Sequence, residues 1–91
     1  MYSKDLIFEK IQKTLIKEFN IDKSLIEETS DFQTDLKMDS LDTIEFIMHL
    51  EEEFDIYIEN KTLSTIHRIN DLIDYIYKQK NKKIQQNGLI N

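Results

Sequence analysis

Apolar residues recur at helical spacing in three separate segments of the chain. In the first segment they form one stripe: Ile7, Phe8, Ile11, Leu15, Ile16 and Phe19. This stripe predicts an amphipathic helix of about four turns. Ser3 is the expected N-cap, because its hydroxyl can accept a bond from a free backbone N–H. Asn20 is the expected left-handed residue that ends the helix.

The second and third helical segments lie in the second half of the chain. The second begins at Asp39 or Ser40 and ends near Phe54. Its residues predicted to face inward are Leu41, Ile44, Phe46, Ile47, Met48, Leu50 and Phe54. Its residues predicted to face solvent are Asp42, Glu45, Glu52 and Glu53. The last helix begins at Ile69 or Asn70 and turns a further apolar set inward: Leu72, Ile73, Ile76 and Tyr77.

The remaining segments read as connections. Residues 21–38 mix polar turn formers with five apolar anchors, which are Ile21, Leu25, Ile26, Phe32 and Leu36. They predict a long ordered loop with one helical turn. Residues 56–58 predict an extended link and residues 60–66 a short helix. The predicted fold is all-α: a four-helix bundle with three main helices, a short third helix, and a long loop between helices 1 and 2. The domain should span residues 1–79, followed by a disordered basic tail at residues 80–91.

Composition narrows the chemistry that the chain can perform. With 91 residues, one domain leaves little room for a deep catalytic cleft. The absence of cysteine excludes disulfides, thiolate metal sites and cysteine nucleophiles, and a single glycine excludes a glycine-rich phosphate loop. His49 and His67 fall on different predicted elements without metal-ligand spacing, so we interpret both as solvated surface residues. We expect neither an enzyme nor a metal site.

The chain shows no targeting or membrane-spanning pattern. Leu6, Ile7 and Phe8 are followed at once by Glu9, which makes this apolar run too short for a signal peptide. No stretch approaches the roughly 18–20 apolar residues that a transmembrane helix needs. We expect a soluble, cytoplasmic monomer that does not insert into membranes.

The negative charge is concentrated in the middle of the chain. The net charge of −6 argues against nucleic acid as a partner. Residues 39–59 contain eight acidic residues and no Lys or Arg, whereas residues 60–91 contain two acidic and six basic residues. A partner steered by charge should therefore be basic and should bind the middle segment.

Ser40 is the one candidate for covalent chemistry. It stands where the second helix begins, so it is either an N-cap or first-turn residue, or an attachment site. The free N–H groups and the dipole of a helix start favour an anion such as a phosphodiester. Position alone does not separate these interpretations.

The residues around Ser40 form a recognisable motif. The run 39–55 reads D-S-L-D-T-I-E-F-I-M-H-L-E-E-E-F-D and resembles the acyl carrier protein signature, D-S-L-D-x-x-E-x-x-M-x-L-E-E-E-F. The likeness continues without a gap over most of the chain. It implies that Ser40 carries phosphopantetheine, with Asp39, Leu41 and Asp42 completing the attachment motif.

The resemblance also implies a mechanism and a set of partners. A phosphopantetheinyl transferase (holo carrier synthase) would transfer the arm from coenzyme A to the Ser40 hydroxyl. Acyl groups would then be held as thioesters on the thiol of the arm, which agrees with a chain that has no cysteine. The partners would be enzymes of fatty acid or lipid biosynthesis and acyl transfer. Two alternatives stay open: a dedicated carrier for aminoacyl, polyketide or cell-envelope acyl groups, and a plain helical adaptor.

Docking should involve the second helix. The resemblance implies that a basic, partly apolar patch on each partner meets Asp42, Glu45, Met48 and Glu52, with Ile58 at the edge of the same surface. The competing interpretation is that these acids form a solvated helix face. The absence of any Lys or Arg between residues 39 and 59 favours a docking surface.

The chain departs from the family pattern near the site. Lys37 stands where the family usually has glycine, which would cost about 1 kcal/mol if the backbone there has positive φ. Glu59 replaces a common proline. The usually acidic third helix carries Asn60, Lys61 and Ser64. These changes spare the attachment motif and bear on the range of partners.

Overall fold

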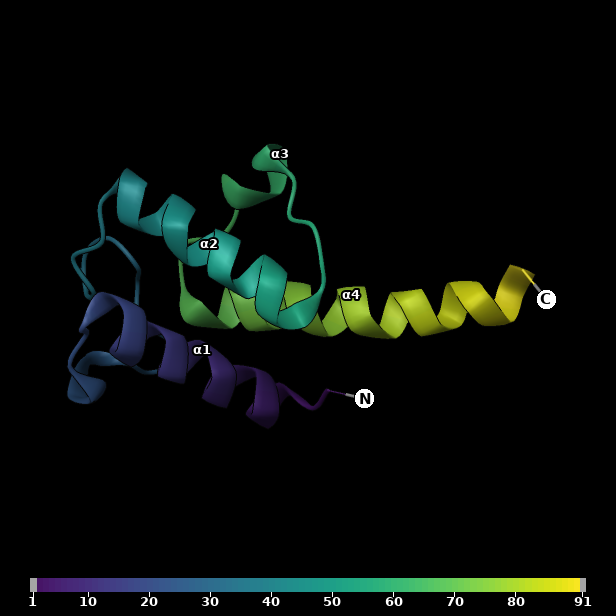
Figure 1. Cartoon of the computed structure of the whole chain (residues 1–91), viewed down its shortest axis with the longest axis horizontal. Helices are drawn as coiled ribbons and strands as arrows, with labels where there is room; N and C mark the ends of the chain where they lie inside the picture. The colour runs from purple at the N-terminus through teal and green to yellow at the C-terminus, as the bar shows by residue number, and fades with distance from the viewer. Residues whose placement is uncertain (1, 91) are drawn as a thin grey trace.

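The computed structural model describes the backbone of residues 2–90 and the side chains of residues 2–81. Its elements, in chain order, are α1 (Lys4–Phe19), a 3-10 turn η1 (Lys23–Leu25), α2 (Ser40–Phe54), α3 (Asn60–Leu63) and α4 (Ile69–Ile90). In Figure 1, α1 runs opposite to α2 and α4, and the short helix α3 lies at the top of the view, in the connection that leads from α2 to α4. The described residues form no β-strand, which confirms the predicted all-α fold with three main helices and a short third one.

The caps predicted for α1 are confirmed. The Ser3 hydroxyl accepts a hydrogen bond from the N–H of Leu6 at 3.1 Å, and Asn20 adopts the left-handed conformation with φ 55°. The buried stripe consists of Ile7, Ile11 and Leu15. It is narrower than predicted, because Ile16 is 38% exposed.

Helix α2 begins and ends as predicted, but its rotation differs from the prediction. Its buried residues are Phe46, Ile47, Leu50 and Phe54. Three residues predicted to face inward are exposed instead: Leu41 at 64%, Ile44 at 53% and Met48 at 61%. They lie three or four positions apart and share one side of the helix. That side faces solvent because the opposite side, which includes both phenylalanines, packs against α1 and the loop.

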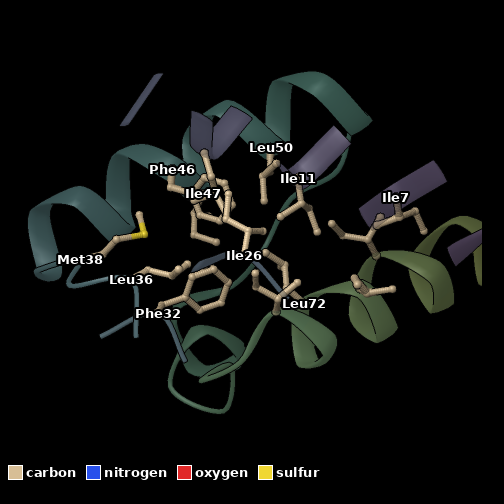
Figure 2. Packing of buried hydrophobic residues seen from close by; sticks show 14 of the residues in the cluster. Ile7, Ile11, Ile26, Phe32, Leu36, Met38, Phe46, Ile47, Leu50 and Leu72 are labelled. Carbon is tan, nitrogen blue, oxygen red and sulfur yellow. The ribbon is translucent and has the colours of Figure 1, made fainter. Parts of the chain in front are cut away.

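The core joins the helices to the long loop. Figure 2 shows Phe32 from the loop, Phe46 from α2 and Leu72 from α4 pointing into the same cluster. The ring of Phe46 lies 5.6 Å from that of Phe32 and 5.9 Å from that of Phe19, measured between centroids. Most of the buried hydrophobic residues come from the helices, and the loop adds four more to the same core. Its loop members are Ile26, Phe32, Leu36 and Met38.

Not every predicted loop anchor is buried. Ile21 is half-buried and packs against the core, whereas Leu25 is 47% exposed, so its predicted role as an anchor is wrong. Leu25 ends the 3-10 turn η1, which is the helical turn predicted within this loop.

Backbone hydrogen bonds tie the loop to the segment that leads into α4. The N–H of Phe32 donates to the carbonyl of His67 at 3.0 Å, and the N–H of Ile69 donates to the carbonyl of Ser30 at 3.0 Å. Asp31 follows Ser30 and precedes Phe32 in the sequence, and its carboxylate accepts the N–H groups of Gln33 and Thr34 at 2.8 and 3.0 Å. The loop is ordered, as predicted, and these bonds fix the course of the chain toward Ser40.

Helix α4 is longer than the sequence pattern indicated. It begins at Ile69 as predicted and continues to Ile90, through residues 80–90 of the predicted irregular tail. Lysine and glutamine have good helix propensity, so a segment rich in both can remain helical without an apolar stripe. The domain boundary at residue 79 stays a prediction. Across residues 2–90, no helix combines the length and apolar character needed to cross a bilayer.

Replacing Asp31 with Asn should lower the melting temperature at pH 7. The N–H groups of Thr34 and Gln33 hold the pKa of the Asp31 carboxyl below its ordinary value of 3.8. A group whose pKa is lowered on folding stabilises the fold above its unfolded-state pKa, and this contribution is lost as the pH falls through the folded-state pKa. Thermal unfolding followed by circular dichroism should therefore show a difference at pH 7 that narrows below about pH 4.

Asp74→Asn is the matched control, because Asp74 forms an exposed ion pair with Lys4 at 3.1 Å. Such pairs contribute little to stability, so this variant should unfold almost like the wild type. A difference for Asp31→Asn that does not change with pH would show that the charge of the carboxylate does not hold the turn.

Candidate functional site

Two aspartates fix the start of α2 by capping each other's backbone. The carboxylate of Asp39 accepts the N–H of Asp42 at 2.8 Å, and the carboxylate of Asp42 accepts the N–H of Asp39 at 3.4 Å. These reciprocal bonds satisfy two N–H groups at the helix start. Asp39 is the N-cap, so Ser40 is a first-turn residue and is not needed as a cap.

The surroundings of Ser40 suit an attached anion. The first bond of the helical ladder runs from the N–H of Thr43 to the carbonyl of Asp39 at 3.0 Å. The N–H groups of Ser40 and Leu41 precede that bond and belong to the positive end of the helix dipole. Ser40 itself is exposed, so an enzyme can reach its hydroxyl. A phosphodiester linked to this oxygen would lie where the helix favours negative charge.

A groove of about 300 Å³ opens beside Ser40. It lies between the loop, the first turns of α2 and the segment from α3 to His67. Its apolar wall consists of Phe32, Ile44, Leu63 and Ile66, and its polar lining consists of Asp31, Gln33, Ser40, Thr43, Ser64 and His67. A slender group attached to Ser40 can lie along this groove. The residues of the site therefore fit a phosphopantetheine arm, with a hydroxyl to link it and a surface to rest on.

The exposed side of α2 combines apolar and acidic residues. We call it the docking face and define it as Leu41, Asp42, Ile44, Glu45, Met48 and Glu52. Of these residues, only Asp42 is half-buried, and the other five are exposed. The structure thus brings together four predicted docking residues: Asp42, Glu45, Met48 and Glu52. Leu41 and Ile44 join them because the rotation of α2 turns both outward.

Ile58 does not belong to this surface. It is 3% exposed, and its N–H donates to the carboxylate of Glu51 at 2.9 Å. Its predicted place at the edge of the surface is wrong, because the extended link after α2 turns Ile58 into the core. Tyr57, its neighbour in the link, is 72% exposed instead.

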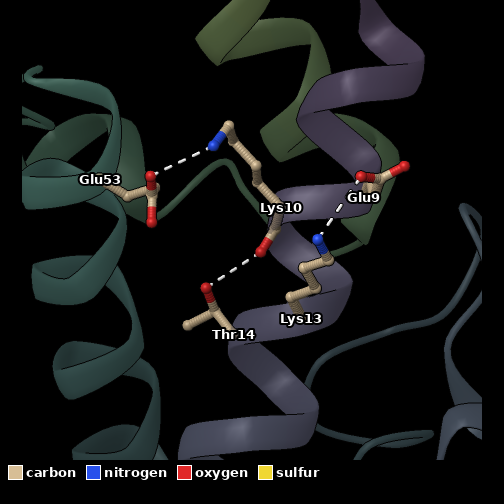
Figure 3. A network of polar contacts seen from close by, with 5 residues as sticks. All are labelled: Glu9, Lys10, Lys13, Thr14 and Glu53. Carbon is tan, nitrogen blue, oxygen red and sulfur yellow. Dashed lines mark hydrogen bonds and ion pairs between the residues drawn. The ribbon is translucent and has the colours of Figure 1, made fainter.

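Other acidic residues of the segment are engaged in the fold. Figure 3 shows Glu53 paired with Lys10 of α1 at 3.3 Å. Glu51 holds the link as described above, and Asp39 is committed to the cap. Glu45 and Glu52 belong to none of these three arrangements, and they lie about two helical turns apart on the docking face. The acidity of residues 39–59 therefore divides into a structural part and a part available to a partner.

The residue three positions before Ser40 has an unusual backbone. Lys37 has φ 59°, so the backbone does have the positive φ that would favour glycine at this position. Its neighbours Leu36 and Met38 are both buried, and the N–H of Met38 donates to the carbonyl of Phe32 at 2.9 Å. These contacts hold the left-handed conformation despite its expected cost of about 1 kcal/mol.

Sequence reasoning missed part of the groove. Gln33, Thr43 and His67 line it with Ser40, although His67 was interpreted as a solvated residue without a role. No periodicity or spacing marks these residues, because their proximity depends on the backbone bonds between the loop and the segment before α4.

An exposed serine at a helix start, beside a partly apolar groove in a small helical bundle, fits a carrier domain that bears a covalent arm. Comparison with known proteins agrees with this class. A family model described as a phosphopantetheine attachment site matches residues 9–76. An acyl carrier protein from Cyanidioschyzon merolae (strain NIES-3377 / 10D) is 36% identical over 83 residues, which cover 91% of this chain and 90% of that protein.

The chain belongs to the acyl carrier protein family, whose cofactor is phosphopantetheine. The resemblance found in the sequence is confirmed. Acyl carrier proteins are substrates and carriers for other enzymes and are not catalysts themselves.

Proposed function

We propose that Ser40 is the attachment site and that the protein carries acyl groups as thioesters to enzymes of fatty acid or lipid biosynthesis. One observation supports the site most directly. Ser40 is an exposed first-turn residue that Asp39 relieves of the capping role, and it opens onto the groove. Its hydroxyl is therefore accessible for modification without loss of the helix start.

Loading requires little chemistry from the carrier. Ser40 Oγ attacks the β-phosphate of coenzyme A, a new O–P bond forms, and the bond to the α-phosphate oxygen breaks so that the adenosine bisphosphate leaves. Magnesium and the transferase assist this transfer, and the proton of the hydroxyl passes to the transferase or to solvent. When bound, the arm supplies the thiol on which an acyl group is held. The carrier contributes position, exposure and the electrostatics of the helix start.

The apolar wall of the groove supports a fatty acyl cargo. Phe32 is buried in the core, Ile66 and Leu63 are half-buried, and Ile44 is exposed at the wall of the groove. Apolar surface of this kind removes the first part of an acyl chain from water. Carriage of fatty acyl groups is therefore favoured over aminoacyl cargo, whose ammonium group would gain nothing from this wall.

The docking face supports recognition by basic partner surfaces. Glu45 and Glu52 attract cations, while Leu41, Ile44 and Met48 provide exposed apolar contacts between and beside them. Methionine adapts its shape to different surfaces, which suits a carrier that meets several enzymes in turn. Phosphopantetheinyl transferase and acyl-handling enzymes with basic patches are the partners that this face fits.

Ser40→Ala should abolish loading and leave the fold intact. Incubation with coenzyme A, magnesium and a phosphopantetheinyl transferase should add one arm to the wild type and none to this variant, as measured by intact mass. Circular dichroism should be almost unchanged, because Asp39 still caps α2. Ser64→Ala is the matched control and should load normally, since its exposed hydroxyl bonds to the carbonyl of Lys61 in α3. Loading of the Ser40→Ala variant would refute the assignment.

Glu45→Lys should slow loading, and Glu27→Lys should not. Both glutamates are exposed, but only Glu45 lies on the docking face. Loss of one exposed charge pair should reduce kcat/KM for the carrier about 1.5- to 5-fold. The wild-type rate should also fall as salt is raised, because exposed charges are screened beyond roughly 8–10 Å. Equal effects of the two substitutions would mean that the acids of α2 serve only solvation.

A further inference from the structure

The structure brings a histidine to the groove beside the attachment residue. His67 and Ser40 are distant in the sequence, yet both line the same groove. The main chain of His67 is held on both sides: its carbonyl accepts the N–H of Phe32 at 3.0 Å, and its N–H donates to the carboxylate of Asp71 at 3.1 Å. The residue is exposed. Its backbone is therefore held in place, and the exposed residue stands at the wall of the groove.

His67 differs from the other residues that line the groove in the charge that its side chain can carry. Among the residues that line the groove, Asp31 and His67 have ionisable side chains, and only the imidazole of His67 can carry a positive charge. The lining residues from α2 and α3 carry no charge. Beyond the groove, Arg68 follows His67, and the Asp71 carboxylate accepts the backbone N–H groups of both. The Asp31 carboxylate is likewise engaged by backbone N–H groups of its own turn.

We infer that His67 is a positioning residue for the arm, which contacts the phosphodiester linked to Ser40 and draws the arm into the groove. This inference rests on the proposed attachment at Ser40. A phosphodiester carries one negative charge throughout the range of about pH 5–8 in which histidine changes its own charge. The protonated ring therefore attracts it, and the neutral ring does so more weakly. The arm lies in the groove more often at mildly acidic pH and leaves it more often as the pH rises.

Phosphorus NMR of the loaded protein tests this contact directly. Because the phosphodiester does not titrate between about pH 5 and 8, an inflection of its chemical shift in that range reports a neighbouring group. Asp31 does not produce such an inflection, because the N–H groups of Thr34 and Gln33 hold its pKa below the ordinary value. We expect an inflection in the wild type and its loss in His67→Gln.

His49→Gln is the matched control. His49 is exposed on α2, with its ring 5.9 Å from that of Phe19, and it does not line the groove. This variant should keep the inflection of the wild type. A wild-type signal without an inflection, or an inflection that survives His67→Gln, would overturn the inference.

Two further measurements keep the outcomes separate. Intact mass before each titration shows whether Ser40 has been loaded, and failure to load would count against the proposed function rather than against His67. If His67→Gln does not fold, the ring signals of the two histidines in the wild type test the inference. On loading, the ring signals of His67 should move while those of His49 stay in place, and equal movement of both rings would refute a specific contact.

Discussion

The reciprocal hydrogen bonds between Asp39 and Asp42 are the interaction on which the site depends. In these bonds the two carboxylates accept backbone N–H groups at N···O distances of 2.8 and 3.4 Å. The first residue of α2, Ser40, is therefore not required to cap the helix. Without them, a serine at this place would itself be drawn into capping, because short polar side chains compete for free N–H groups at a helix start. Ser40 instead combines exposure with the electrostatic advantage of the helix end.

The two sides of α2 separate stability from recognition. Phe46 packs against Phe32 and Phe19 and connects the helix to the loop that precedes the site. The other side exposes apolar and acidic residues to solvent. Exposed apolar surface is unfavourable in water, and a partner that covers this surface on binding removes the unfavourable exposure. The acids that brace the fold, such as Glu51 and Glu53, are distinct from Glu45 and Glu52 on the docking face. A change at Glu45 or Glu52 can therefore alter partner binding without unfolding the protein, whereas Asp42 belongs to both the docking face and the cap of α2.

Local patterns predicted the elements better than they predicted their faces. The caps at Ser3 and Asn20, the start of α2 and the covalent candidate Ser40 follow from neighbouring residues, so the sequence contains the information directly. Neighbouring residues do not determine the outward position of Leu41, Ile44 and Met48. Helix α2 has apolar residues on more than one side, and packing decides which of these sides is covered. The place of His67 depends on hydrogen bonds between distant segments, which no local pattern encodes.

The central claim is that this carrier functions through an arm on Ser40, and the most direct test is the mass of the protein isolated from its own cells. Intact mass followed by peptide mapping should find one phosphopantetheine on the peptide that contains Ser40. An additional acyl mass in the same peptide would identify the cargo. Native protein that carries no arm, or an arm on any other residue, would contradict the account.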